Sequence, residues 1–350
     1  METSPSQFGQ CPACDSSSAR LLFTAGDRRW STTDRVFQIV ECCGCRLIRL
    51  HPQPAPLELA GYYPADYWKP LEHDLHDWLR QKYRRLVLSD RVHFVERSLS
   101  ESAEAESVEL TAGKRGILLD VGCGDGFLLS ILADRDHSAA RGRRPVAGLD
   151  FSLDAATSAW RDHRVPVICG TLSCAPFADG SCSVVTMFHV LQHLYNPVAY
   201  LDAAHRLLSP EGRLIVEVPN AACWQFLLFG DKWHGMDVPR QLLCFRASDL
   251  ETLLEHCGFE VLRRKQFSLC DNPASLASSL LFTMDPVIGP LRRRLARSKW
   301  RLASDLAYLA LVLACLPFTI FEAACNAGST VMVEARKKGV TQKRNGDVVT

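Results

Sequence analysis

An acid followed by three glycines carries the strongest chemical signal in this chain, within LLDVGCGDGFLL at residues 118–129. The apolar start predicts a buried parallel strand that ends on Asp120, and the apolar residues from Phe127 onwards predict a helix. Between them lie Gly122, Gly124 and Gly126. Glycines allow a tight strand-to-helix turn and let a ligand lie against bare backbone.

The spacing of these glycines indicates the kind of ligand. A dinucleotide site has the spacing G-x-G-x-x-G, which seats a pyrophosphate on a helix N-terminus. Here the pattern is D-x-G-x-G-x-G, with a carboxylate at the end of the strand. That negative charge would repel a pyrophosphate, whereas it suits a cationic ligand that carries an ammonium group.

Two further segments follow at matching intervals. PVAGLDFS at residues 145–152 predicts a second strand ending in Asp150, and an acid about 20 residues beyond a glycine loop is the usual partner of ribose hydroxyls. APFADGSCSVVTMFHVLQHL at residues 175–194 predicts a fourth strand and its following loop, and GRLIVEVPN at residues 212–220 predicts a fifth strand.

Together these motifs resemble the class I S-adenosylmethionine-dependent methyltransferases over residues 116–265. The resemblance implies an α/β fold with a doubly wound, Rossmann-like, seven-stranded methyltransferase sheet. It also implies that S-adenosylmethionine is bound by a set of residues at the ends of the strands: Asp120, Gly122, Gly124, Gly126, Asp150, Phe151, Thr171 and His189. Two positions depart from the family pattern, since Thr171 replaces an Asp and Gln192 replaces a Glu.

Histidines are the best candidates for a general base, because the unperturbed pKa of histidine lies near neutrality and Gln192 cannot act as one. His193 follows the fourth strand, and His234 lies in the loop after the fifth. We therefore predict a catalytic role for His193 or His234, with a structural or exposed histidine as the alternative for each. Arg240 matches an arginine of the family pattern and would grip an anionic substrate group or pair with an acid.

Two C-x-x-C pairs near the N-terminus predict a metal site. Cys11 and Cys14 form one pair and Cys42 and Cys45 the other, with strand-like alternation between them over residues 19–24 and 35–41. Four thiolates at this spacing suit a tetrahedral, structural Zn²⁺ in a zinc ribbon, and a metal would substitute for the core that a unit of about 50 residues is too small to build. A redox C-x-x-C motif is the alternative, although it would favour one pair of cysteines and not two. Cys43 breaks the spacing and is interpreted as a non-ligand. The whole chain resembles a bacterial subset of these methyltransferases that carries such a ribbon.

The segment that joins the ribbon to the core is predicted to form a helix over residues 74–98. In the subset, the aromatic segment YYPADYW at residues 62–68 and this helix cover the cofactor as a lid; docking of the helix on the core is the alternative. The acidic stretch at residues 101–109 predicts a solvated linker.

The C-terminal part contains an insertion before the last core strand, which is predicted at residues 329–338. Its uncharged run at 306–321 gives a helix of about 24 Å, shorter than a hydrocarbon core of ~30 Å, and Pro317 is expected to interrupt it, so we reject a transmembrane span. The preceding residues 292–301 hold six cations and no acid. Four interpretations of residues 292–321 stay open: contact with a membrane surface, burial on the core, burial on a second subunit, and contact with nucleic acid.

The predicted organisation follows the chain in six parts: a zinc ribbon (1–56), a helical lid and acidic linker (57–110), the S-adenosylmethionine-binding core (111–267), a hydrophobic and basic helical insertion (268–328), the last core strand (329–338) and a disordered tail (339–350). A chain of 350 residues with 47% hydrophobic residues can bury such a core. The 15 cysteines, without a secretory signal, predict reduced thiols in the cytoplasm or peripherally at the inner membrane surface.

The sequence thus predicts a methyltransferase that acts on oxygen or carbon of a small molecule or glycan, such as a lipid-linked sugar or a secondary metabolite. A homodimer is compatible with it. The net charge of +1 argues against a nucleic-acid partner, although an RNA methyltransferase is one alternative function. A non-catalytic cofactor-binding scaffold is the other.

Overall fold

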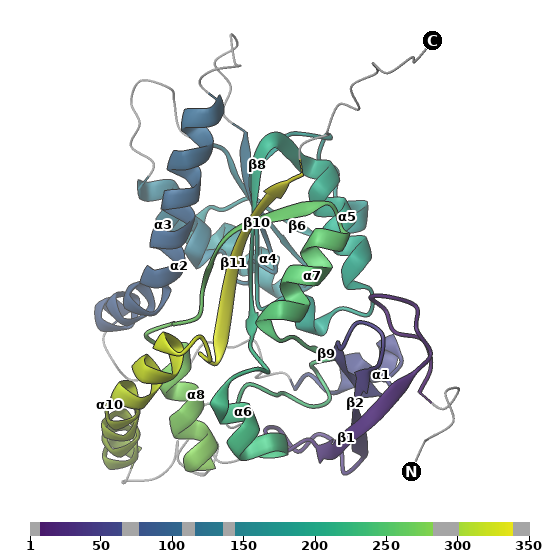
Figure 1. Ribbon diagram of the computed structural model, residues 1–350. Coiled ribbons are helices and arrows are strands. Elements are labelled where there is room, and N and C mark those ends of the chain that lie inside the picture. Colours follow the sequence, from purple (N-terminus) through teal and green to yellow (C-terminus); the bar gives the residue numbers. More distant parts are fainter. Residues whose placement is uncertain (1–7, 65–76, 107–115, 136–143, 283–300, 339–350) are drawn as a thin grey trace, which may run out of the picture.

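The computed structural model describes residues 8–64, 77–106, 116–135, 144–282 and 301–338. Two sheets organise these residues (Figure 1). The smaller sheet has the order β1-β2-β3-β9, and the larger has the order β10-β11-β8-β7-β4-β5-β6.

The larger sheet has seven strands and confirms the predicted doubly wound methyltransferase fold. It runs through β10 (Phe259–Lys265), β11 (Thr330–Lys337), β8 (Leu208–Pro219), β7 (Cys182–Phe188), β4 (Ile117–Val121), β5 (Val146–Asp150) and β6 (Val167–Cys169). All neighbouring pairs from β8 to β6 are parallel, whereas β11 runs antiparallel to both β8 and β10. The last core strand therefore lies where the sequence places it. Because the carboxyl ends of the parallel strands meet at one edge, ligands of such sheets bind there.

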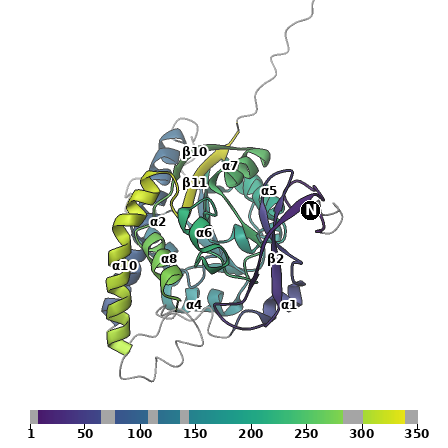
Figure 2. The ribbon, with the colours of Figure 1, turned by 60° about the horizontal axis from the view of Figure 1, so that its bottom comes forward.

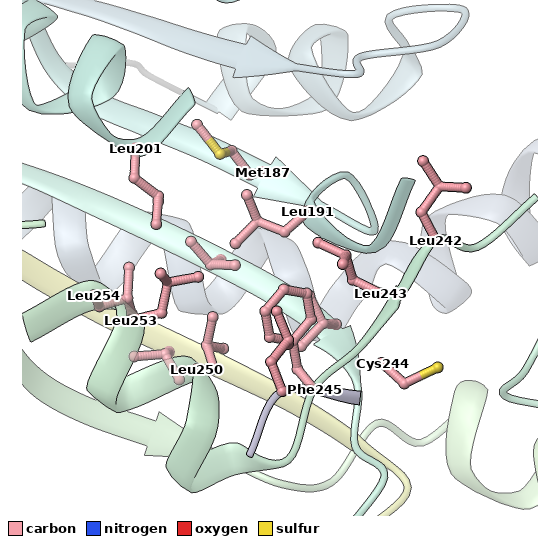
Figure 3. Close-up of a cluster of buried hydrophobic side chains, with 14 of the residues drawn as sticks. Met187, Leu191, Leu201, Leu242, Leu243, Cys244, Phe245, Leu250, Leu253 and Leu254 are labelled. Atoms are coloured by element: carbon pink, nitrogen blue, oxygen red, sulfur yellow. The ribbon is translucent and has the colours of Figure 1, made fainter. Parts of the chain in front are cut away.

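Helices cover both faces of this sheet. One face packs against α2 (Asp77–Glu106) and α3 (Phe127–Arg135), with α4 (Leu153–His163) next to α3. The other face packs against α5 (Pro197–Leu207) and α7 (Ala247–His256). Figure 3 shows the core on this second side, where three leucines of α7, Leu250, Leu253 and Leu254, meet Leu201 and Phe245.

Helix α2 settles one alternative and corrects one prediction. Val92, Phe94 and Val95 are buried against the sheet, so this part of the helix docks on the core. The acidic stretch does not form a linker from residue 101, because α2 continues through Glu106. Residues 65–76, which include most of the predicted aromatic lid, lie outside the described residues.

The ribbon forms the predicted hairpin, from β1 (Ala19–Gly26) and β2 (Val36–Cys42). Strand β3 (Ile48–His51) continues the sheet, and helix α1 (Pro56–Gly61) follows. The fourth strand, β9 (Leu243–Cys244), comes from the part of the chain that forms the larger sheet and pairs with β3. The ribbon is therefore joined to the core by strand pairing.

The C-terminal insertion forms α8 (Asp271–Leu280) and α10 (Arg301–Ala324), and the short α6 (Trp224–Phe229) lies beside them (Figure 2). The prediction that Pro317 interrupts the helix is wrong, because α10 continues through this residue. The whole helix has 24 residues and a length of about 36 Å. The length argument against a membrane span therefore fails. Among the described helices, Ala303–Ala324 alone is long and apolar enough to cross a membrane, and 17% of its most apolar window is buried.

Candidate active site

The glycine loop joins β4 to α3 at the carboxyl edge of the sheet. Gly122, Gly124 and Gly126 all have positive φ, between +56° and +74°. A Cβ atom on Gly122 would lie 2.6 Å from the side chain of Val190, and one on Gly126 would lie 2.9 Å from Ala159. Gly124, in contrast, faces open space. The first and third glycines are therefore required by packing, and the second leaves bare backbone for a ligand.

Asp120 lies at the end of β4 and is 4% exposed. Its Oδ1 accepts a hydrogen bond of 2.6 Å from the hydroxyl of Thr186. Burial raises the pKa of Asp120 to about 7, against the opposing effects of Thr186 and the nearby Arg91. Ionisation of a buried carboxyl group is costly when the group is alone, and it becomes favourable when a cation lies beside it. This is the property that an ammonium-bearing ligand would use.

Asp150 ends the next strand, β5, and faces the same loop. Its two oxygens accept hydrogen bonds from the backbone N–H groups of Gly124, at 3.0 Å, and Ser152, at 2.9 Å. Burial raises the pKa of this carboxyl as well. Phe151 is 62% exposed, and Thr171 precedes a short turn beyond β6. The structure thus places the predicted cofactor residues on adjacent strand ends.

His189 follows β7 directly and has an unusual backbone for a histidine, with φ at +56°. Its Nε2 lies 3.5 Å from a carboxylate oxygen of Glu217, and its backbone N–H donates to the Glu217 carbonyl. The His189 side chain is 33% exposed, whereas that of Glu217 is fully buried. One nitrogen of an accessible imidazole is therefore held by a buried acid.

Arg91 of α2 completes this cluster. Its Nε donates to Glu217 at 2.6 Å, and its Nη2 reaches both Glu217 and Asp271 at 3.2 Å. Burial disfavours ionisation of Glu217, but Arg91 and His189 outweigh it and hold the pKa of Glu217 well below its usual range. The ligand atoms of His189, Glu217 and Asp271 come close enough to share a metal ion. The guanidinium already supplies the positive charge there, so we interpret the cluster as an ion-pair network.

Glu217 and Arg91 are not among the site residues predicted from the sequence. Glu217 stands within the apolar run of GRLIVEVPN, and an acid inside a buried strand is itself a sign that a partner is nearby. No comparable signal marks Arg91, which is one of several arginines on α2.

His193 and His234 lie in different surroundings. The Nδ1 of His193 is 2.9 Å from the carbonyl oxygen of Arg240, so this nitrogen carries the proton and donates. Burial lowers the pKa of His193. His234 lines a separate pocket with Arg28 and Arg29 of the ribbon, and its Nε2 lies 3.4 Å from Arg29. The structure therefore does not bring His234 together with the His189 cluster.

Arg240 pairs with acidic side chains of the protein. Of the two predicted roles, an anionic substrate contact or an internal ion pair, the structure shows the second. Its side chain is fully buried and contacts Asp27 at 2.6 Å and Asp237 at 2.7 Å. It also donates to the carbonyl of Tyr62 at 2.8 Å. With all these partners inside the protein, Arg240 cross-links the ribbon to the core.

The four predicted zinc ligands converge in the ribbon. The sulfur atoms of Cys11, Cys14, Cys42 and Cys45 lie within 4.8 Å of one another. Two of these pairs, Cys11–Cys45 and Cys14–Cys42, are 3.6 and 3.5 Å apart. Tetrahedral Zn–S bonds of ~2.3 Å require sulfur atoms about 3.8 Å apart, so the cluster fits this ion.

The pKa values of these thiols are shifted in opposite directions, since burial raises those of Cys11 and Cys45 while that of Cys42 is lowered. Burial opposes ionisation of Cys42, but the backbone N–H groups of Cys45 and Gly44 outweigh it and lower its pKa to about 7. Burial raises the pKa of Cys11 to about 11. A closed set of four thiolates, which a divalent cation would hold in the ionised form, is typical of a structural zinc.

Comparison with known proteins gives a consistent result. Residues 81–264 match the model of a family described as a methyltransferase domain. A relative from Mycolicibacterium smegmatis, named a probable S-adenosylmethionine-dependent methyltransferase, is 33% identical over 150 residues, which are 41% of this chain and 52% of that protein. The ubiquinone biosynthesis O-methyltransferase of Pseudomonas aeruginosa is 29% identical over 163 residues, or 43% and 66% of the two chains.

These matches thus span about half to two thirds of the curated relatives' length. Among solved structures, the geranyl diphosphate C-methyltransferase of Streptomyces coelicolor A3(2) superposes with a TM-score of 0.46 at 13% identity, covering 79% of this chain and 88% of the other.

Proposed function

The chain belongs to the S-adenosylmethionine-dependent methyltransferase family, and from this premise we propose that it transfers a methyl group to oxygen or carbon of a small molecule or glycan. The observation that supports this most is the placement of two sets of residues at one edge of the sheet. The glycine loop with Asp120 and Asp150 ends β4 and β5, and the His189–Glu217 pair ends the neighbouring β7 and β8.

The residues of the first set would hold the cofactor. Asp120 would meet the ammonium group, Asp150 the ribose hydroxyls and Phe151 the adenine ring, with Gly124 leaving the backbone open between them. Thr171 would offer a hydrogen bond near the adenine. The cofactor, when bound, supplies a methyl group already activated by its sulfonium, so the protein must align the acceptor and exclude water.

The second set would handle the proton of a hydroxyl acceptor. We favour His189 over His193 and His234 because a buried carboxylate orients its Nε2, which leaves Nδ1 to accept a proton. The acceptor oxygen forms the new bond to the methyl carbon as the carbon–sulfur bond breaks, and the O–H proton passes to Nδ1 of His189. Glu217 stabilises the imidazolium that results.

The proposal also covers the binding partners of the protein and its localisation in the cell. The acceptor is a small molecule or glycan, the zinc ribbon is structural, and the protein works in the cytoplasm or at the inner membrane surface through residues 292–321. A nucleic-acid acceptor is disfavoured by the net charge of +1. A homodimer is compatible with this activity but is not required by it.

A label-transfer assay tests the proposed function. The purified full chain is incubated with methyl-labelled S-adenosylmethionine and a cell extract that is then separated into lipid, small-molecule, glycan and RNA fractions. We expect label in the lipid, small-molecule or glycan fraction, and loss of that label in Asp150→Ala at unchanged zinc content. Label confined to RNA would overturn the substrate class, and a Kd for S-adenosylmethionine weaker than millimolar would favour a non-catalytic scaffold.

A further inference from the structure

The exposed face of α10 is apolar, and the polar side chains in its C-terminal half face the protein. Leu306, Leu309, Leu313, Ile320 and Phe321 are each more than half exposed. Thr319 and Glu322, in contrast, are fully buried. Helices at the surface of water-soluble proteins show the opposite arrangement, with the apolar stripe toward the core. This helix is therefore built for an apolar environment on its outer side.

Contacts near both ends hold α10 along the body of the protein. The hydroxyl of Tyr308 lies 2.9 Å from that of Ser278 on α8. Fourteen residues later, Glu322 accepts hydrogen bonds from the backbone N–H and side-chain amide of Gln225, at 3.1 and 2.8 Å. Between them Cys315 packs against α8. With one side occupied along its length, α10 would lie parallel to a bilayer and not cross it.

Helix α6 extends the apolar surface. The ring of Trp224 packs against Phe318 and Phe321 of α10, with centroids 6.1 and 5.7 Å apart. One turn further along α6, Leu227 and Leu228 are 74% and 69% exposed. Adjacent exposed apolar side chains on two helices form a surface of the kind that marks interaction sites.

We propose that the outer face of α10 and the exposed leucines of α6 form a docking face that inserts in the plane of an anionic lipid membrane. Charge favours lipid over a second copy of the chain. Residues 292–301, which end on the first residue of α10, carry six cations and no acid, and 306–321 carries no charge; Asp305 is the acid between them. Anionic headgroups complement these cations, whereas a second copy would bring the same cations and, among the residues that are not fully buried on α10, the single half-buried acid Asp305.

This face is connected to the candidate active site through α8. Helix α10 packs on α8, and Asp271 at the start of α8 contacts Arg91, which binds Glu217 beside His189. Docking would therefore fix the active-site edge relative to the bilayer. This last step rests on the proposed function, because it assumes methyl transfer at that edge. It implies that the methyl acceptor is a molecule carried by a membrane lipid.

Vesicle flotation of the full chain tests the docking face separately from catalysis. The probes are vesicles of phosphatidylcholine alone and of phosphatidylcholine with 30 mol% phosphatidylglycerol. The variant is Leu309→Glu/Leu313→Glu, whose positions are 51% and 60% exposed, so the fold should tolerate the change. The matched control is Leu57→Glu on α1, a position 92% exposed at a distance from α10 (Figure 1).

We expect the parent chain and Leu57→Glu to float with the anionic vesicles, and the double variant to bind them about tenfold or more weakly. S-Adenosylmethionine affinity, measured on the same samples, should be equal in all three proteins. Absent flotation, or flotation that the double variant leaves unchanged, would overturn the proposal. So would a dimer that the double variant dissociates, which would assign the face to a second copy. Flotation with no cofactor binding would instead contradict only the proposed function.

Discussion

The guanidinium of Arg240 lies 2.6 and 3.1 Å from the two carboxylate oxygens of Asp27, although 213 positions separate these residues in the chain. Asp27 follows β1 of the ribbon, and Arg240 lies in the loop after β8. Both side chains are fully buried. Asp27 also accepts hydrogen bonds from the backbone of Trp30 and Thr32, so it fixes the turn of the hairpin. The pair therefore ties the ribbon's fold to its position on the core.

Arg240→Met should strongly destabilise the protein, because it leaves Asp27 and Asp237 buried without their shared cation. Removing one partner of a buried ion pair costs about 3–5 kcal/mol. The control is Arg206→Met, which breaks an exposed pair with Asp179 and should cost no more than about 1 kcal/mol. Chemical denaturation of both variants measures the difference. Equal free energies of unfolding would show that the Arg240 cluster is not a structural link.

Cys14→Ser should abolish zinc binding, because it removes one of the four thiolates that converge in the ribbon. The neighbouring Cys43 provides a matched control, since it is an exposed cysteine outside the cluster. Elemental analysis should find one zinc per chain in the parent protein and in Cys43→Ser, and well below that in Cys14→Ser. The last variant should also be less soluble. Full zinc content in Cys14→Ser would show that the four-cysteine assignment is wrong.

Local patterns predicted much of this molecule because they reflect local chemistry. The glycine loop, the acids at the ends of β4 and β5 and the paired cysteines are each defined by neighbours in sequence, and the structure places them accordingly. The last strand, β11, was predictable from its β-branched residues despite the long insertion before it.

The rest depends on contacts between distant segments. The Arg91–Glu217 pair joins residues 126 positions apart and forms only when α2 docks on the sheet. Strand β9 has two residues, too few for any periodicity, and exists because β3 offers an edge. Helix α10 continues through Pro317, and on either side of it Tyr308 and Glu322 make hydrogen bonds to other segments, which a single-sequence rule for proline cannot include.

Asp120→Asn should stabilise the free protein above neutral pH while weakening cofactor binding. The pKa of Asp120 is raised from 3.8 to about 7, so stability is lost as the pH rises between these values. The asparagine removes this loss, and we expect a gain on the order of 1–3 kcal/mol at pH 8 and none near pH 4. Denaturation at both pH values measures it. A gain of equal size at both would contradict the assigned cause.

The same titration should govern affinity for the cofactor. An ammonium group needs the ionised form of Asp120, so the Kd for S-adenosylmethionine should rise as the pH falls below about 7. Calorimetric titration of Asp120→Asn should show a Kd at least about tenfold weaker at pH 8, with little of this pH dependence left. Unchanged affinity would mean that Asp120 does not meet the ammonium group.

His189→Ala should lower kcat for a hydroxyl acceptor by about 10²–10⁴-fold, the range typical of a lost general base. His256→Ala, at an exposed position on α7, should leave kcat unchanged. Glu217→Gln should lower kcat less than His189→Ala, because Glu217 positions the imidazole without touching the substrate. His193→Ala provides the decisive comparison. A loss of kcat of this size in that variant, with kcat retained in His189→Ala, would assign the base to His193 and overturn the role that we give to His189.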